Sequence, residues 1–218
     1  MADISRRLRL LMLRASFYPF TAATCALLVF AGFLTLTATG QDITQRVLQD
    51  VGWAPRDLLA LDIGRTAYSA LVTNGGYVFW MALVLTVVFV GAAEHLAGSA
   101  VAALTFWGVH FATTATMLLV SLPLHISGVS LATLVFLTRD VGPSAGYVGC
   151  LGLSLVLTRA RWHRWALGAV GLFLVTALAV SLSTPGTAPA DVSANLAHVI
   201  ALPYGAALGW VVARRKAR

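Results

Sequence analysis

The most informative stretch of the chain is Gly142-Pro-Ser-Ala-Gly-Tyr-Val-Gly-Cys-Leu-Gly152. Its one serine, Ser144, is surrounded by four spaced glycines: Gly142, Gly146, Gly149 and Gly152. Glycines at such spacing let the backbones of neighbouring membrane helices approach closely. Pro143 suits the first turn of a helix, because the N–H that proline lacks would have no partner there. The stretch therefore predicts a closely packed membrane helix with a serine at its start.

The composition of the whole chain predicts several membrane helices in addition to this one. Of the 218 residues, 59% are hydrophobic and only 11% are charged, whereas soluble domains carry about 25% charged residues. A membrane span needs roughly 20 predominantly apolar residues, and lipid-buried backbone favours helices. Six segments meet or approach this requirement: residues 17–37, 77–96, 101–122, 145–157, 165–182 and 192–212. We therefore expect an all-α, polytopic six-span bundle, whose short fourth span extends back to Val141.

The basic residues set the expected orientation. Eleven of the 15 form three clusters, which are Arg6, Arg7, Arg9 and Arg14, then Arg159, Arg161 and Arg164, and finally Arg214, Arg215, Lys216 and Arg218, while the loops on the opposite side carry mixed charge. With six spans all three clusters lie on one side, and the positive-inside rule makes that side the cytoplasm. The net charge of +7 is then explained by orientation and anionic lipid, without nucleic acid. The preference for arginine over lysine favours a bacterial, high-GC genome.

These boundaries define the expected domain organisation in the inner or plasma membrane. Residues 1–16 form a cytoplasmic segment, residues 17–213 the membrane domain, and residues 214–218 a basic cytoplasmic tail. Within the outer loop, residues 38–76, the stretch 43–51 has helical spacing and either lies in the membrane interface or is an ordinary connector. The second outer loop, residues 123–142, is semi-apolar and is either re-entrant or lies over the bundle.

A second stretch, residues 194–209, carries His198 near the outer end of the sixth span. Small residues lie on or beside the helix face that carries His198, namely Ala201, Gly205 and Gly209. This face can press against the glycines of the fourth span, which brings Ser144 and His198 to similar depth. A histidine within hydrogen-bond reach of a serine is the minimal apparatus of nucleophilic catalysis. The backbone at the helix start would support an oxyanion, at Gly142, Pro143 and Ala145.

The remaining polar residues have more ordinary interpretations. His110, in the middle of the third span, is either functional or a neutral histidine bonded to a threonine or to backbone of a neighbouring helix. His125 lies in the second outer loop and could approach the serine. The two cysteines, Cys25 and Cys150, fall inside spans and fit neither a disulfide framework nor a metal site. Neither a metal-binding cluster nor a nucleotide-binding loop is present, so we expect no cofactor.

Together these stretches resemble the rhomboid family of intramembrane serine proteases, over about residues 64–215. The family's Gly-x-Ser-Gly motif and its following glycines are matched by Gly142, Ser144, Gly149 and Gly152. Its sixth-span histidine and the small residues three and seven positions on are matched by His198, Ala201 and Gly205. Its Glu-x-x-x-Gly-Ser turn after the second span is matched by Glu94, Gly98 and Ser99. The arginine that enters its second span is matched by Arg65.

The resemblance implies a Ser144–His198 dyad that cleaves transmembrane protein substrates, which reach the site laterally between spans two and five. It also implies that Glu94 makes a structural hydrogen bond. Gly64, just before Arg65, stands where the family has a tryptophan, and three further positions depart from the family pattern. Ala145 replaces the glycine after the serine, and Val78 and Ala82 replace a histidine and an asparagine that help to stabilise the oxyanion. The alternative is therefore a catalytically inactive rhomboid-like protein that binds membrane-protein clients. A small transporter or channel component is a weaker alternative.

Overall fold

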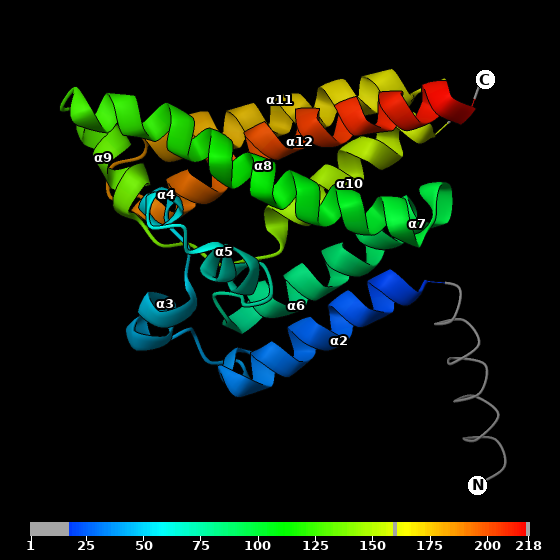
Figure 1. The fold of residues 1–218 in the computed structure, drawn as a ribbon. Helices are drawn as coiled ribbons and strands as arrows, with labels where there is room; N and C mark the ends of the chain where they lie inside the picture. Colours follow the sequence, from blue (N-terminus) through cyan, green and yellow to red (C-terminus); the bar gives the residue numbers. More distant parts are fainter. Residues whose placement is uncertain (1–17, 159–160, 217–218) are drawn as a thin grey trace, which may run out of the picture.

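The computed structural model describes residues 18–158 and 161–216, and this part of the chain is built from helices and their connections (Figure 1). The segment 1–16 with its arginines lies outside the described residues, as do Arg159 and Arg218. In chain order the elements are α2 (Pro19–Leu34), a 3-10 turn (Thr37–Thr39), α3 (Gln45–Val51), α4 (Pro55–Leu59), α5 (Ile63–Ser69), α6 (Gly76–Leu85), a π-helical segment (Thr86–Val90), α7 (Gly91–Ala97), α8 (Ser99–Ile126), α9 (Ser130–Leu137), α10 (Ser144–Leu157), α11 (His163–Ser183) and α12 (Pro189–Lys216).

The long apolar helices make this a multi-pass membrane protein. Within the described ranges four helical stretches are long and apolar enough to cross a membrane, namely Gly76–Ala97, α8, α11 and α12. The helices α2 and α10 are also apolar but have only 16 and 14 residues, or about 24 and 21 Å against a hydrocarbon core of about 30 Å. Each of the six apolar segments expected from the sequence contains helix.

The expected extension of the fourth span back to Val141 is wrong. The helix α10 begins at Ser144. Gly142 has φ +147°, a conformation that glycine adopts readily and that a helix does not use. Its N–H donates instead to the carbonyl of Ser69, at 2.8 Å. The chain therefore turns sharply before Ser144, which leaves the serine at the first turn of the helix.

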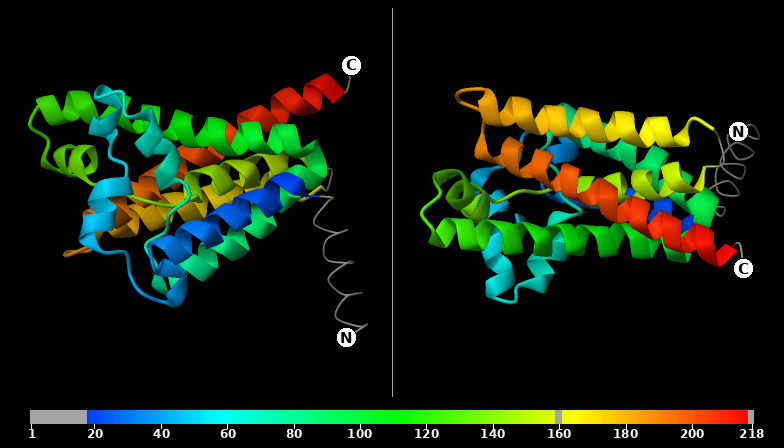
Figure 2. Two further views of the ribbon diagram at one scale, coloured as in Figure 1. Left: turned by 60° about the horizontal axis from the view of Figure 1, so that its bottom comes forward. Right: turned by 90° about the horizontal axis from the view of Figure 1, so that it is seen from above.

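The helix α10 lies in the middle of the bundle, between α8 and α12 (Figure 2). Nine of its 14 residues are buried. On one side, a Cβ on Gly146 would lie 2.6 Å from the ring of Phe106, and one on Gly149 would lie 2.7 Å from the side chain of Val109. The α8 side of α10 is therefore shaped by the absence of side chains at these two glycines.

The other side of α10 packs backbone to backbone against α12. A Cβ on Gly205 would overlap the backbone of Gly149. One on Gly152 would lie 2.5 Å from the carbonyl oxygen of Leu202, and one on Gly209 would lie 3.0 Å from that of Leu153. Ala201, on the same side of α12, is fully buried. The close approach predicted from the glycine spacing is present, and the two helices run parallel.

Glu94 in α7 joins this helix to α2. Its carboxylate accepts hydrogen bonds from the N–H groups of Phe20 and Thr21 at 2.9 and 2.8 Å, and from the Thr21 hydroxyl at 2.6 Å. The Ser99 hydroxyl donates a fourth, at 2.6 Å. A carboxylate is well suited to unpaired N–H groups at a helix start. Gly98, between Glu94 and Ser99, has φ +86° and lets the chain turn from α7 into α8.

The short helices of residues 38–76 are held together by two arginines. Arg139 bonds to Asp57 at 2.8 Å and to the carbonyl of Gly52 at 2.6 Å. Arg65 reaches the same Gly52 carbonyl at 3.3 Å and pairs with Asp62 at 3.0 Å. The segment predicted to be helical at 43–51 is α3. In the second outer loop, α9 folds back against the end of α8 (Figure 1).

Candidate functional site

Ser144 lines a small cavity beside the loop of residues 38–76. The volume of this cavity is about 30 Å³, and its walls come from α5, α8, α10, α12 and the loops before α4 and α10. Besides Ser144 the walls include Trp53, Ser69, His110, Thr113, Thr114, Met117, Asp140, Val141, Gly142, Ala145 and Ala197. The predicted residues Gly142, Ser144 and Ala145 are thus brought together with polar side chains that are distant in the sequence.

The start of α10 offers free backbone donors next to Ser144. The first i to i−4 bond at this end of the helix is that of Tyr147, whose N–H donates to the Pro143 carbonyl at 3.0 Å. The first N–H groups of a helix have no partner within the helix. Those of Ser144, Ala145 and Gly146 are in this position, and such donors can hold developing negative charge on an oxygen.

His198 lies at nearly the depth of Ser144. Gly149 and Gly205 touch each other and give a common reference point on the two parallel helices. His198 precedes Gly205 by seven residues, or about 10 Å along α12, and Ser144 precedes Gly149 by five, or about 8 Å along α10. Seven residues is about two turns, so His198 is on the face of α12 that meets α10. Its Nε2 atom is buried and has no hydrogen-bond partner within the described chain. In this structure Ser144 and His198 are not hydrogen-bonded to each other.

His110 of α8 is hydrogen-bonded to the backbone of a neighbouring helix, which is one of the two interpretations drawn from the sequence. Its Nε2 is 2.8 Å from the backbone carbonyl of Thr66 in the neighbouring α5. A carbonyl can only accept, so Nε2 carries the proton and Nδ1 is a free acceptor. This Nδ1 is buried and unpartnered among the described residues. The sequence did not reveal that His110 lines the same cavity as Ser144.

Two further polar atoms of the cavity residues have no partner in the described ranges, the indole N–H of Trp53 and the hydroxyl of Thr113. Both residues are at least 96% buried. Buried polar groups are normally hydrogen-bonded, to protein or to ordered water. A cavity of about 30 Å³ is large enough for a water molecule, and this one offers the two to four polar partners that a buried water needs.

Asp140 is a cavity residue that the sequence interpretation missed. Its backbone pairs with that of Trp53 through two hydrogen bonds of 2.9 and 2.8 Å, and its carboxylate accepts from the Val141 N–H at 2.8 Å. Burial raises the pKa of Asp140 to about 7, and the charge of Asp191 adds to this shift. An aspartate four residues before the serine was the available signal, but nothing in the sequence indicated that it would line this cavity.

Other residues considered from the sequence lie outside this cavity. His125 bonds to Thr133 at 2.9 Å and stacks on Phe136. Ala82 is buried, and neither it nor Val78 lines the cavity wall. Over residues 18–158 and 161–216, no three His, Cys, Asp or Glu side chains are placed to hold a metal ion.

Comparison with protein-family models, with curated proteins and with solved structures finds no match for this chain. The function therefore has to be inferred from the site itself. Its main features are a serine at the start of a buried helix, an unpartnered imidazole at similar depth, and a small cavity with unsatisfied polar atoms.

Proposed function

We propose that this chain is an intramembrane serine protease of the rhomboid type, with Ser144 as nucleophile and His198 as base. The observation that carries the proposal is the backbone contact of Gly149 with Gly205, which brings the two side chains to similar depth on packed helices. The proposal includes six spans, with α2 and α10 as the short ones. Both ends of the chain then lie in the cytoplasm, and Ser144 lies toward the outer side.

The reaction is an acyl transfer to the serine followed by hydrolysis. His198 Nε2 takes the proton of the Ser144 hydroxyl as Oγ attacks a peptide carbonyl of a transmembrane substrate. The imidazolium then gives this proton to the leaving amine, and an acyl-enzyme remains. A water molecule, activated by the same imidazole, releases the carboxylate product and regenerates the serine.

Two parts of the site support this chemistry. The free N–H groups of Ser144, Ala145 and Gly146 would hold the oxyanion of the tetrahedral intermediate. The cavity lined by His110, Thr113 and Trp53 would store the hydrolytic water beside Ser144 within an otherwise apolar bundle. The hydrogen bond between Ser144 and His198 would form on substrate binding, since catalytic hydrogen bonds often tighten only in the substrate complex.

A second candidate is a rhomboid-like protein that binds membrane-protein clients without cleaving them. Two observations favour it. Ser144 and His198 form no hydrogen bond with each other, and Val78 and Ala82 have no side-chain donor for an oxyanion. Losing one oxyanion donor costs about 10²–10³-fold in turnover, so a protein of this sequence would be a slow protease or none.

Fluorophosphonate labelling of the purified protein separates the two candidates. The wild type is compared with Ser144→Ala, with His198→Ala and with Ser154→Ala. Ser154 lies on the same helix and bonds to the Cys150 carbonyl at 2.8 Å, which makes it a matched control. We expect the wild type and Ser154→Ala to be labelled and to cleave helix-destabilised transmembrane substrates, and Ser144→Ala to do neither.

Equal labelling of wild type and Ser144→Ala would refute Ser144 as the nucleophile. The client-binding candidate is correct if the wild type neither reacts with the label nor cleaves. In that case the wild type and Ser144→Ala should both co-purify with the same transmembrane proteins. Labelling that survives His198→Ala at the wild-type rate would show that another base, such as His110, activates the serine.

A further inference from the structure

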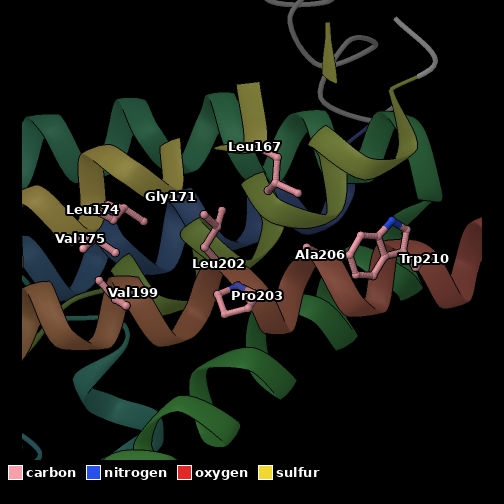
Figure 3. Close-up of a pocket in the computed structure, with 9 residues that line it drawn as sticks. All are labelled: Leu167, Gly171, Leu174, Val175, Val199, Leu202, Pro203, Ala206 and Trp210. Carbon is pink, nitrogen blue, oxygen red and sulfur yellow. The ribbon is translucent and has the colours of Figure 1, made fainter. Parts of the chain in front are cut away.

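An apolar groove of about 320 Å³ runs between α11 and α12 (Figure 3). Its lining includes Leu167, Gly171, Leu174, Val199, Leu202 and Trp210. Its volume is within the range of about 300–1,000 Å³ that is usual for small-molecule sites. Val175, also in the lining, is 52% exposed and Trp210 is 56% exposed, so the groove opens on the outside of the bundle.

The groove exists because α11 is loosely attached. Of the 21 residues of α11 only Leu174 and Ser181 are buried. At Gly171 the missing side chain leaves room, since a Cβ there would meet only Leu202, at 3.8 Å. Both helices are apolar and long enough to cross a membrane. The molecules that surround this groove are therefore lipids.

The length of the groove matches one leaflet of a bilayer. Along α12 it extends from Val199 to Trp210, which at 11 residues is about 16 Å. This is about half of a hydrocarbon core of roughly 30 Å. A transmembrane helix would need a groove along the whole core, whereas a single lipid tail reaches from the headgroup level to the middle.

The end of the groove at Trp210 is basic. Tryptophan is typical of the membrane interface, at headgroup level. Arg214 follows Trp210 by four residues, and Arg164 precedes Leu167 by three, so each lies about one turn beyond the groove on the same helix face. Both arginines are exposed. Neither forms a hydrogen bond or ion pair within the part of the chain that the structure describes.

We propose that the α11–α12 groove binds one anionic phospholipid, with an acyl chain in the groove and its phosphate at Arg164 and Arg214. The tail fills the space beside Gly171 and adds packing between α11 and the bundle. The two guanidinium groups provide the donors and the positive charge that a phosphate requires. This site is independent of Ser144 and holds for either function proposed above.

Native mass spectrometry of the full chain tests the site. The protein is released from nanodiscs that contain equal amounts of phosphatidylglycerol and phosphatidylcholine with identical acyl chains. We expect one retained lipid, with phosphatidylglycerol preferred by about tenfold because of the two arginines. Gly171→Leu fills the groove and is expected to reduce retention at least several-fold. Gly168→Leu is the matched control, because a Cβ at Gly168 meets nothing within 4 Å.

The double variant Arg164→Gln/Arg214→Gln separates the headgroup from the tail. We expect it to keep one lipid and to lose the preference for phosphatidylglycerol. The charge-matched control is Arg46→Gln/Arg56→Gln, in the outer loop. Equal lipid retention by Gly171→Leu and Gly168→Leu, with both folded by near-ultraviolet circular dichroism, would overturn the proposal. So would a change from dimer to monomer in Gly171→Leu, which would identify the groove as an interface between two copies.

Discussion

Gly205 of α12 lies directly against Gly149 of α10, so close that a Cβ on Gly205 would overlap the Gly149 backbone. Two helices can approach in this way only where neither carries a side chain. The contact determines how far α12 can slide along α10. Because His198 is two turns above it on one helix and Ser144 is five residues above it on the other, the same contact sets the relative depth of the proposed catalytic pair.

Gly205→Ala is expected to destabilise the bundle. The added methyl group meets backbone atoms, which no change of rotamer can relieve, so we expect a loss of about 1–3 kcal/mol in the free energy of unfolding. Unfolding by denaturant in detergent micelles measures it. Gly168→Ala, at a position with no atom within 4 Å of a Cβ, is expected to be neutral or stabilising, since alanine favours helix. Equal stability of the two variants would contradict the prediction.

Glu94→Gln is expected to loosen α2 from the rest of the bundle. The carboxylate accepts four hydrogen bonds, whereas the amide has one oxygen and directs an NH₂ group toward donors. We expect a loss of about 3 kcal/mol, because buried donors are left unpaired. Asp62→Asn, in the surface pair with Arg65, is expected to change stability by less than about 1 kcal/mol. The same unfolding measurement applies, and a neutral Glu94→Gln would refute the role of this residue.

Asp140 is expected to make stability depend on pH. Its pKa rises from 3.8 to about 7 in the folded protein, so between these values the folded state holds a proton that the unfolded state has lost. Stability should therefore fall as the pH rises from about 4 to 7, and level off above that. Asp140→Asn should flatten this part of the profile in thermal unfolding, whereas the exposed Asp50→Asn should not. A slope that persists in Asp140→Asn would assign it to another group.

Thr113→Val tests whether the cavity beside Ser144 holds water. If the cavity is dry, removing an unpartnered buried hydroxyl should stabilise the protein by about 1 kcal/mol or more and leave cleavage unchanged. We expect the opposite, with no gain in stability and substrate cleavage about tenfold slower, because a water ligand is lost. Thr105→Val, on the same helix but bonded to the Val101 carbonyl at 2.7 Å, serves as the control for cleavage.

Much of the helical framework followed from hydropathy alone, since a long apolar run in lipid has few alternatives to helix. Local signals also sufficed at α3, which begins after the capping Thr44, and at the Glu94–Ser99 turn. Other features could not be predicted in this way. The π-helical turn at Thr86–Val90 and the start of α10 at Ser144, not Val141, depend on contacts made by the folded chain.

The sequence by itself determined that the chain is a multi-pass helical membrane protein, and it singled out the glycine rows of α10 and α12. These are properties of composition and spacing, which act locally. Only the tertiary structure decided which groups surround Ser144. Trp53, the α8 pair His110 and Thr113, and Asp140 come from three separate parts of the chain, and their meeting depends on how the loop of residues 38–76 folds over α8 and α10. The apolar groove beside α11 likewise exists only because α11 is packed on one side and left open on the other.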